Sequence, residues 1–382
     1  MSLSAPYPWF GGKSRAAPVI WERFGDVVNY VEAFAGSLAV LLGRPTEPRI
    51  ETVNDLDCYL ANFWRAMKEA PDEVARWADD PVNEADLHAR HVWLVGQVDF
   101  RERMLTDPMY FDARIAGWWV WGLCAWIGSG WCALGREKPS RQLPTLVGGS
   151  AEGSAYYGKS IHSGAYRTPS RQLPALAGST NDKGSYANYG KGIHGGGMRT
   201  PSRQLPHLGG GGVNESAIAN HGRGIHNAGT RTRIQEVFQA LSHRLRHTRV
   251  ACGDFERVLS DSVTWRHGLT GVLLDPEYPE GTQGLYTGKG AKDGEHVWYR
   301  AARWAAEHGD DKRLRIALCG YSDTWQAPPG WTEYAWKAKG GYGGQSDGEN
   351  VNATRERVWF SPHCIAAEDV KGAQLSLLRA TA

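Results

Sequence analysis

An acid, a proline and an aromatic residue follow the short apolar run at residues 271–274. Asp275, Pro276 and Tyr278 together offer two hydrogen-bond acceptors and a ring that can stack on a base. An exocyclic amine is a poor nucleophile because its lone pair is delocalised into the base. A carboxylate and a backbone carbonyl that accept its N–H protons can turn this lone pair toward a methyl donor. The pattern therefore favours methyl transfer to a base that has been flipped out of a duplex.

A second candidate site lies near the N-terminus, where the apolar run 27–33 leads into the turn Phe34-Ala35-Gly36-Ser37. Gly36 would let the backbone approach a ligand closely, and the acid Asp55 follows about 20 residues later, as in dinucleotide-binding units. In Rossmann-like sheets an acid at this spacing ends the second strand and binds ribose hydroxyls. Taken alone, the pattern also fits an ordinary turn between a strand and a helix.

The elements that position these residues alternate between strand and helix patterns, which predicts an α/β fold with a largely parallel sheet. Residues 27–33 and 271–274 are expected strands. Apolar residues from Ile234 to Leu245 recur at helical spacing and predict an amphipathic helix with a basic last turn. We expect this helix to follow an insertion that splits one domain.

The expected insertion is basic and contains an internal repeat. From Arg136 to Arg233 the chain has thirteen Lys or Arg and four acids, a net charge of +9, which leaves −7 for the rest of a chain whose total is +2. Two short patterns occur three times each, Pro-Ser-Arg-Gln-Leu-Pro and a Gly-Lys/Arg-Ser/Gly-Ile-His run. Recurring basic residues in a Gly-rich segment indicate either a polyanion-binding insertion or a solvated basic loop.

The uncharged run 115–135 is long enough to span a bilayer, but its composition argues against a membrane segment. Its five tryptophans lie through the middle and five glycines interrupt it. We expect a buried aromatic scaffold or a wall beside a base-binding pocket. The N-terminus has no signal-peptide pattern, so a cytoplasmic location is expected.

Scattered cysteines without a Cys-x-x-Cys pair argue against a zinc knuckle and a disulfide framework. The closest histidine pair, His88 and His91, lacks a third ligand and is expected at the surface, so no metal is predicted.

In this order along the chain, five motifs resemble those of the alpha group of N6-adenine DNA methyltransferases, the Dam-like family, and in particular its phage and prophage branch. They are residues 7–13, 34–37, 54–57, 253–255 and 275–278, and the runs 318–322 and 357–362 are similar to the closing motifs of the family. The ordered set is much more specific than any single motif. The resemblance implies a Rossmann-like, S-adenosylmethionine-dependent methyltransferase domain that acts on double-stranded DNA and releases S-adenosylhomocysteine.

The resemblance also implies roles for particular residues. The cofactor site would consist of Trp9, Gly12, Lys13, Phe34, Gly36, Asp55, Asp254 and Phe255. Asp275 and the Pro276 carbonyl would hold the target amine, and Tyr278 would stack on the flipped base. The family places its target-recognition region where the basic repeats lie, which suggests DNA contacts from Arg141, Arg171, Arg203, His162, His194 and His226.

Two positions depart from the family pattern. Leu38 stands where a second glycine is usual, and Glu277 stands where a second proline is usual. Leu38 falls at an expected helix start and can point into the core. Glu277 adds a negative charge beside the amine pocket, where it either turns outward or weakens catalysis.

The predicted organisation is a methyltransferase domain formed by residues 1–110 and 234–382, interrupted by a target-recognition insertion at 111–233. The alternatives are a DNA-binding protein of the same fold that is impaired in catalysis, or methylation of cytosine N4 or RNA. The target sequence, a partner nuclease, and the choice between monomer and homodimer are left open by the sequence.

Overall fold

The computed structural model describes residues 3–9, 11–126, 131–132, 230–279, 295–336 and 354–369. Helices and strands alternate along them, as predicted for an α/β fold. The strands are β1 (Asn29–Glu32), β2 (Ile50–Asp55), β3 (Thr248–Cys252), β4 (Thr270–Leu274), β5 (Leu314–Tyr321), β6 (Thr332–Ala335) and β7 (Glu356–Phe360). The α-helices are α1 (Ala17–Phe24), α2 (Ala39–Leu42), α3 (Cys58–Glu69), α4 (Pro71–Ala78), α5 (Glu84–Val95), α6 (Phe100–Thr106), α7 (Ala113–Ala125), α8 (Thr230–Leu245) and α9 (Val297–His308).

The strands form one sheet in the order β3-β2-β1-β4-β5-β7-β6. Strands β1 to β5 run parallel, whereas β7 is antiparallel to both β5 and β6. The two central strands, β1 and β4, are buried along their whole length, as expected for strands covered on both faces. Because the strand order reverses between β1 and β4, their carboxyl ends form the switch point where open α/β sheets bind ligands.

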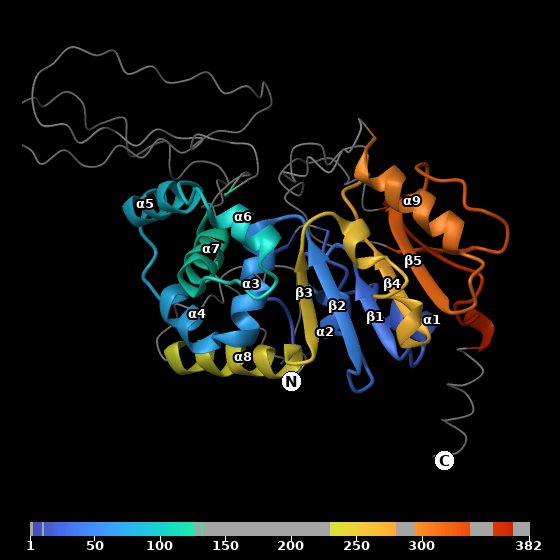
Figure 1. Cartoon of the computed structure of the whole chain (residues 1–382), viewed down its shortest axis with the longest axis horizontal. Coiled ribbons are helices and arrows are strands. Elements are labelled where there is room, and N and C mark those ends of the chain that lie inside the picture. Colours follow the sequence, from blue (N-terminus) through green and yellow to red (C-terminus); the bar gives the residue numbers. More distant parts are fainter. Residues whose placement is uncertain are drawn as a thin grey trace, which may run out of the picture. The chain divides into compact units, whose positions relative to one another are not determined.

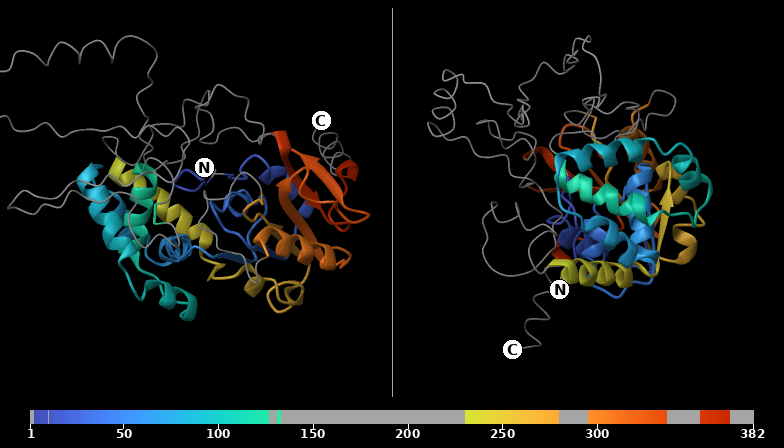
Figure 2. Two further views of the ribbon diagram at one scale, coloured as in Figure 1. Left: turned by 90° about the horizontal axis from the view of Figure 1, so that it is seen from above. Right: turned by 90° about the vertical axis from the view of Figure 1, so that its left-hand side faces the viewer.

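The helices between β2 and β3 gather beyond the β3 edge of the sheet (Figures 1 and 2). Among them, α7 packs on both α3 and α4, and α8 also contacts both. The predicted amphipathic pattern of α8 is confirmed, because Ile234, Phe238, Leu241 and Leu245 are all buried. This helix leads directly into β3, so it returns the chain to the sheet.

An aromatic cluster joins the N-terminal segment to this helical group. The Tyr7 ring lies 5.4 Å from the Phe63 ring of α3 and 5.5 Å from the Trp119 ring of α7, and Phe63 also contacts Phe238 of α8. Such edge-on aromatic pairs add to the energy of simple burial. The segment that precedes α1 is therefore fixed against the helices before it reaches the sheet.

The tryptophan-rich run that begins the predicted insertion forms the buried helix α7. Asp112 caps it by accepting a hydrogen bond from the Ile115 amide. Its glycines permit close packing, because a Cβ at Gly117 would lie 2.3 Å from Trp77 and one at Gly122 would lie 1.8 Å from Trp131. These residues thus form an aromatic scaffold. Within the described part of the chain, no helix combines the length and apolar character needed to cross a membrane.

The structure corrects one expectation about histidines. His91 was expected at the surface, yet it is buried, and its ring stacks on Trp126 at 5.2 Å and contacts Trp131 at 5.1 Å. The reason is that residues 126 and 131, beyond the end of α7, fold back over α5. Burial lowers the pKa of His91, which favours the neutral ring in this setting.

Candidate functional site

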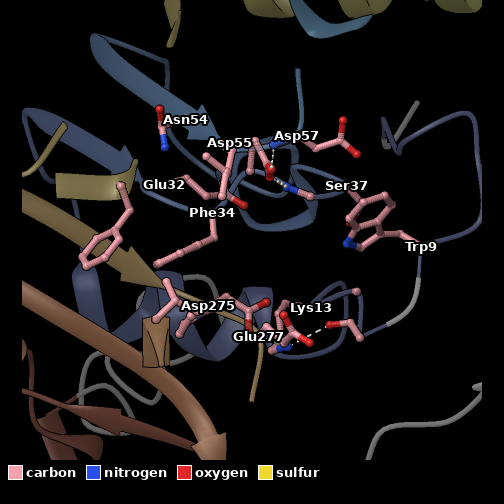
Figure 3. A pocket seen from close by; sticks show the side chains of 18 of the residues that line it. Trp9, Lys13, Glu32, Phe34, Ser37, Asn54, Asp55, Asp57, Asp275 and Glu277 are labelled. Carbon is pink, nitrogen blue, oxygen red and sulfur yellow. Dashed lines mark hydrogen bonds and ion pairs between the residues drawn. The ribbon is translucent and has the colours of Figure 1, made fainter. Parts of the chain in front are cut away.

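One cavity lies at the carboxyl ends of the central strands and contains both predicted sites (Figure 3). Its volume is about 1210 Å³, counted with the space that opens to solvent. Residues after β1, β2, β3 and β4 line it, together with the N-terminal loop. The lining residues are Trp9, Gly11, Gly12, Lys13, Glu32, Phe34, Ala35, Gly36, Ser37, Ala39, Asn54, Asp55, Leu56, Asp57, Gly253, Asp254, Phe255, Asp275, Pro276, Glu277, Tyr278, Val297, Tyr321 and Glu356.

The turn after β1 needs a glycine at its centre. Gly36 has a φ of 46°, and a Cβ there would lie 2.6 Å from Nε1 of Trp9. Its amide donates to Asp55 Oδ2 at 3.1 Å, and its carbonyl accepts from the Tyr7 hydroxyl and the Trp64 indole. The turn is therefore held on both sides by side chains from other elements.

Leu38 adopts the left-handed backbone conformation, with a φ of 52°, and it is fully buried. This conformation costs roughly 1–2 kcal/mol in a residue that has a Cβ, which explains why a glycine suits the position. The buried side chain offsets that cost. The expectation that Leu38 points into the core is confirmed.

Asp55, the last residue of β2, faces the cavity beside the Gly36 turn. Its Oδ1 accepts from the Asp57 amide at 2.9 Å and its Oδ2 accepts from the Gly36 amide. Burial raises the pKa of Asp55 to about 7, although these amides oppose the shift. A carboxylate held in this way can still accept from hydroxyl groups through its remaining lone pairs.

An aromatic pair and an ion pair connect the turn after β1 with the segment after β3 and with α9. The rings of Phe34 and Phe255 stack with centroids 5.1 Å apart. Arg300 of α9 donates to both oxygens of Asp254 at 2.9 Å and lies over the Phe255 ring. Sequence reasoning missed Arg300, since nothing in the helical pattern of α9 distinguishes this arginine from a surface one.

On the other side of the cavity, Lys13 pairs with the predicted catalytic acid. Its Nζ lies 2.8 Å from Asp275 Oδ1 and also donates to the Gly11 carbonyl. Burial alone would lower the pKa of Lys13, but the Asp275 carboxylate outweighs it and the pKa is raised overall. Lys13 therefore stays charged. Its ammonium contacts Asp275, a pairing that the sequence did not reveal, and its place in the cofactor site stays a prediction.

Tyr278 is nearly buried and its hydroxyl lies between two carboxylates. The hydroxyl oxygen is 3.3 Å from Asp275 Oδ1 and 3.0 Å from Glu356 Oε2. Its ring meets Tyr321 edge-on at 4.7 Å, and Lys13 lies 5.4 Å from its centroid. Burial, followed by the nearby carboxylates, raises the pKa of Tyr278, so the phenol remains protonated.

Glu277 lines the cavity beside Asp275 (Figure 3). It therefore does not turn away from the pocket, which was one of the two outcomes expected for this departure. Burial raises the pKa of Glu277 to about 7. The side chain is partly neutral near that pH, which reduces the charge it adds next to the amine position.

The lining of the cavity is strongly acidic. Lys13 is the one cationic side chain among the lining residues, against the seven carboxyl groups Glu32, Asp55, Asp57, Asp254, Asp275, Glu277 and Glu356. Sequence reasoning missed Glu32 and Glu356, which end β1 and begin β7. An isolated acid at the end of a strand carries no distinctive signal, so only the packing of the sheet reveals them.

The structure therefore brings together every predicted residue of the cofactor and catalytic sets, because Trp9, Gly12, Lys13, Phe34, Gly36, Asp55, Asp254, Phe255, Asp275, Pro276 and Tyr278 all line one cavity. The predicted DNA-contacting residues Arg141, Arg171, Arg203, His162, His194 and His226 lie outside the described residues. Most of the predicted insertion 111–233 also lies outside them. Its boundaries stay a prediction.

The sheet order, the acidic cavity at the switch point and the acid-proline-aromatic strand end define a Rossmann-like methyltransferase fold. Residues 9–90 match the family model described as D12 class N6 adenine-specific DNA methyltransferase. This match confirms the predicted resemblance and indicates a DNA adenine methyltransferase enzyme. No curated protein is similar enough to the chain to count as a match.

Proposed function

We propose that this chain transfers a methyl group from S-adenosylmethionine to N6 of adenine in double-stranded DNA, with the target base flipped into the cavity. The supporting observation is that one cavity contacts both the Gly36 turn after β1 and the Asp275–Tyr278 segment after β4. A nucleoside cofactor and a base would then be held side by side by adjacent strands. Holding two reactants close together in the right orientation provides much of the rate enhancement in such a transfer.

The chemistry of the lining fits a cationic cofactor. Carboxyl groups outnumber lysine seven to one in the lining, and those that are ionised would repel the phosphates of a nucleotide but attract a sulfonium cation. Asp55 would bind the ribose hydroxyls, Phe34, Asp254 and Phe255 would contact the adenine, and Trp9, Gly12 and Gly36 would line the remaining wall. When bound, the cofactor supplies the electrophilic methyl group.

Asp275, Pro276 and Tyr278 would hold the target base. The Asp275 carboxylate and the Pro276 carbonyl would accept the two protons of the amine and turn its lone pair toward the methyl group. Lys13, 2.8 Å from Asp275, holds this carboxylate in place. The Tyr278 ring would stack on the flipped base, since every base presents a π-face.

The basic repeats would supply DNA affinity. In this proposal Arg141, Arg171 and Arg203, together with the repeated histidines, contact phosphates or base edges. Phosphate contacts position a protein on a duplex, whereas base contacts give it sequence preference. The net charge of +9 between residues 136 and 233 supports this role.

Mass spectrometry of nucleosides tests the proposal directly. Unmethylated genomic DNA is incubated with the purified protein and S-adenosylmethionine that carries a deuterated methyl group, and Asp275→Ala serves as the control. We expect deuterated N6-methyladenine with the unchanged protein alone. N4-methylcytosine in its place would contradict the adenine target. DNA binding without any methylated base would show that the chain binds DNA but does not modify it.

A further inference from the structure

Glu356 occupies an unusual position for a buried acid. It is the first residue of β7, pairs in register with Tyr321 of β5, and is 7% exposed. It lies far outside the span 9–90 that matches the methyltransferase family model. Burying a carboxyl group is costly unless it is hydrogen-bonded. Its Oε2 accepts from the Tyr278 hydroxyl at 3.0 Å, a contact that joins β7 to the segment after β4.

We propose that Glu356 is a positioning residue that holds the Tyr278 ring in the orientation needed to stack on the target base. This inference rests on the proposed methyl transfer. Tyr321 meets one part of the ring edge-on at 4.7 Å, and the Lys13 ammonium lies 5.4 Å from its centroid. Glu356 binds the hydroxyl at the far end. The three contacts together restrict both the tilt of the ring and its rotation.

The same hydrogen bond also affects Asp275. A phenol has one proton and can donate it to one acceptor at a time. The Tyr278 hydroxyl lies closer to Glu356 (3.0 Å) than to Asp275 (3.3 Å), and Asp275 Oδ1 already binds the Lys13 ammonium. When the phenol donates its hydrogen bond to Glu356, Asp275 keeps acceptor capacity for the protons of the target amine.

The backbone of Glu356 secures the strand independently of its side chain. Its carbonyl accepts from the Trp336 amide, and β7 pairs with β5 through main-chain bonds. A change of the side chain should therefore leave the sheet in place. This separation makes the proposed role testable.

A double-mutant cycle measures whether Glu356 acts through the Tyr278 hydroxyl. The single-turnover rate of methyl transfer to unmethylated genomic DNA is measured for Glu356→Ala, Glu356→Gln, Tyr278→Phe and the Glu356→Ala/Tyr278→Phe pair. We expect Glu356→Ala to lower the rate by about tenfold while the KM for S-adenosylmethionine stays within about twofold. Gln keeps a carbonyl acceptor, so Glu356→Gln should restore most of the rate.

In the Tyr278→Phe background, Glu356→Ala should lower the rate by no more than about twofold, because the hydroxyl it acts on is gone. Glu307→Gln, at an exposed site on α9 and outside the cavity lining, is the control and should leave the rate unchanged. An equal loss from Glu356→Ala in both backgrounds would overturn the proposal, and so would an unchanged rate in Glu356→Ala.

The same four variants are also unfolded in urea, where coupling between positions 278 and 356 reports the hydrogen bond without any catalysis. Coupling in urea is expected, and its absence overturns the proposal. An unchanged protein that methylates no DNA but shows this coupling would refute the proposed function and leave the contact between the two residues established.

Discussion

At Asp275 a partly exposed carboxylate lies 2.8 Å from the buried ammonium group of Lys13. Buried ion pairs contribute little net stability, but removing one partner leaves an uncompensated charge in the interior. Lys13 is thus paired with the acid that we propose to hold the target amine. Its position within the N-terminal motif gave no sign of this pairing.

Lys13→Met tests the pairing. We expect the rate of methyl transfer to fall by about 100-fold, because Asp275 loses the ammonium group that holds its carboxylate in place. Affinity for S-adenosylmethionine, measured by calorimetry, should not weaken, since the lining becomes still more acidic. Lys312→Met, at an exposed position, is the control. A large loss of cofactor affinity with an intact rate would instead place Lys13 at the cofactor.

Glu32 offers a test based on pH. Burial raises its pKa to about 8, against the opposing hydrogen bonds from Tyr30 and the Leu41 amide. The folded protein therefore retains a proton that the unfolded chain releases above its ordinary pKa of 4.5. Consequently this group makes the ligand-free protein less stable as pH rises from about 5 to 8, by roughly 1 kcal/mol per pH unit.

Glu32→Gln should flatten this dependence, because glutamine does not titrate. The measurement is urea unfolding of the ligand-free protein at several pH values between 5 and 8. Glu307→Gln, at an exposed site on α9, should keep the slope of the unchanged protein. Parallel curves for Glu32→Gln and the unchanged protein would rule out a proton on Glu32.

At the scale of elements, the turn between β1 and α2 combines two demands on the backbone. Gly36 and Leu38 both have positive φ values, 46° and 52°. At Gly36 the neighbouring Trp9 indole excludes a Cβ, whereas at Leu38 the core accepts a large side chain. The leucine at residue 38, where the family usually has glycine, therefore accepts backbone strain and gains packing in the core.

The combination of strain and packing at Leu38 predicts that the glycine variant is more stable to unfolding than the alanine variant. Leu38→Ala should cost about 2–5 kcal/mol, because it removes buried contacts and keeps the strain. Leu38→Gly should cost about 1 kcal/mol less than Leu38→Ala, since glycine adopts this conformation freely. Thermal or urea unfolding of the three proteins decides the point. In an ordinary helical position alanine would be the more stable of the two.

At the scale of the whole molecule, charge is divided between the parts of the chain. Residues 136–233 carry +9 and the rest carries −7, and the cavity at the sheet is acidic. A polyanion would be attracted to the first part and repelled by the second. The division fits a protein whose DNA contacts and cofactor site lie in different segments.

Replacing Arg141, Arg171 and Arg203 by Ala together should lower the dependence of DNA affinity on salt. If each contacts a phosphate, the slope of log K against log salt should decrease in magnitude by about 2 to 3. Fluorescence anisotropy with a labelled duplex at several salt concentrations measures it. Replacing the exposed Arg49, Arg303 and Arg313 by Ala is the matched control and should leave the slope unchanged. Equal slopes for all three proteins would mean that the repeats do not bind phosphate.

Local patterns in the sequence were sufficient for the fold class and for two segments of the cavity, and the family resemblance supplied its other predicted residues. Strand β4 followed by Asp275, and β1 followed by Gly36, are short segments in which hydrophobicity and turn chemistry act over a few residues. The amphipathic helix α8 was predicted for the same reason. The match of residues 9–90 to the adenine methyltransferase family model agrees with this reading.

The pairings inside the cavity were decided by tertiary structure alone. Lys13 meets Asp275, Arg300 meets Asp254, and Glu356 meets Tyr278 only because the parallel sheet brings the ends of distant strands to one edge. These partners lie far apart in the sequence, and a charged residue looks the same in a sequence whether its partner is water or a buried group. The sequence by itself indicated the type of reaction through the residues that follow β1 and β4. The folded sheet decided which side chains contact those residues and position them.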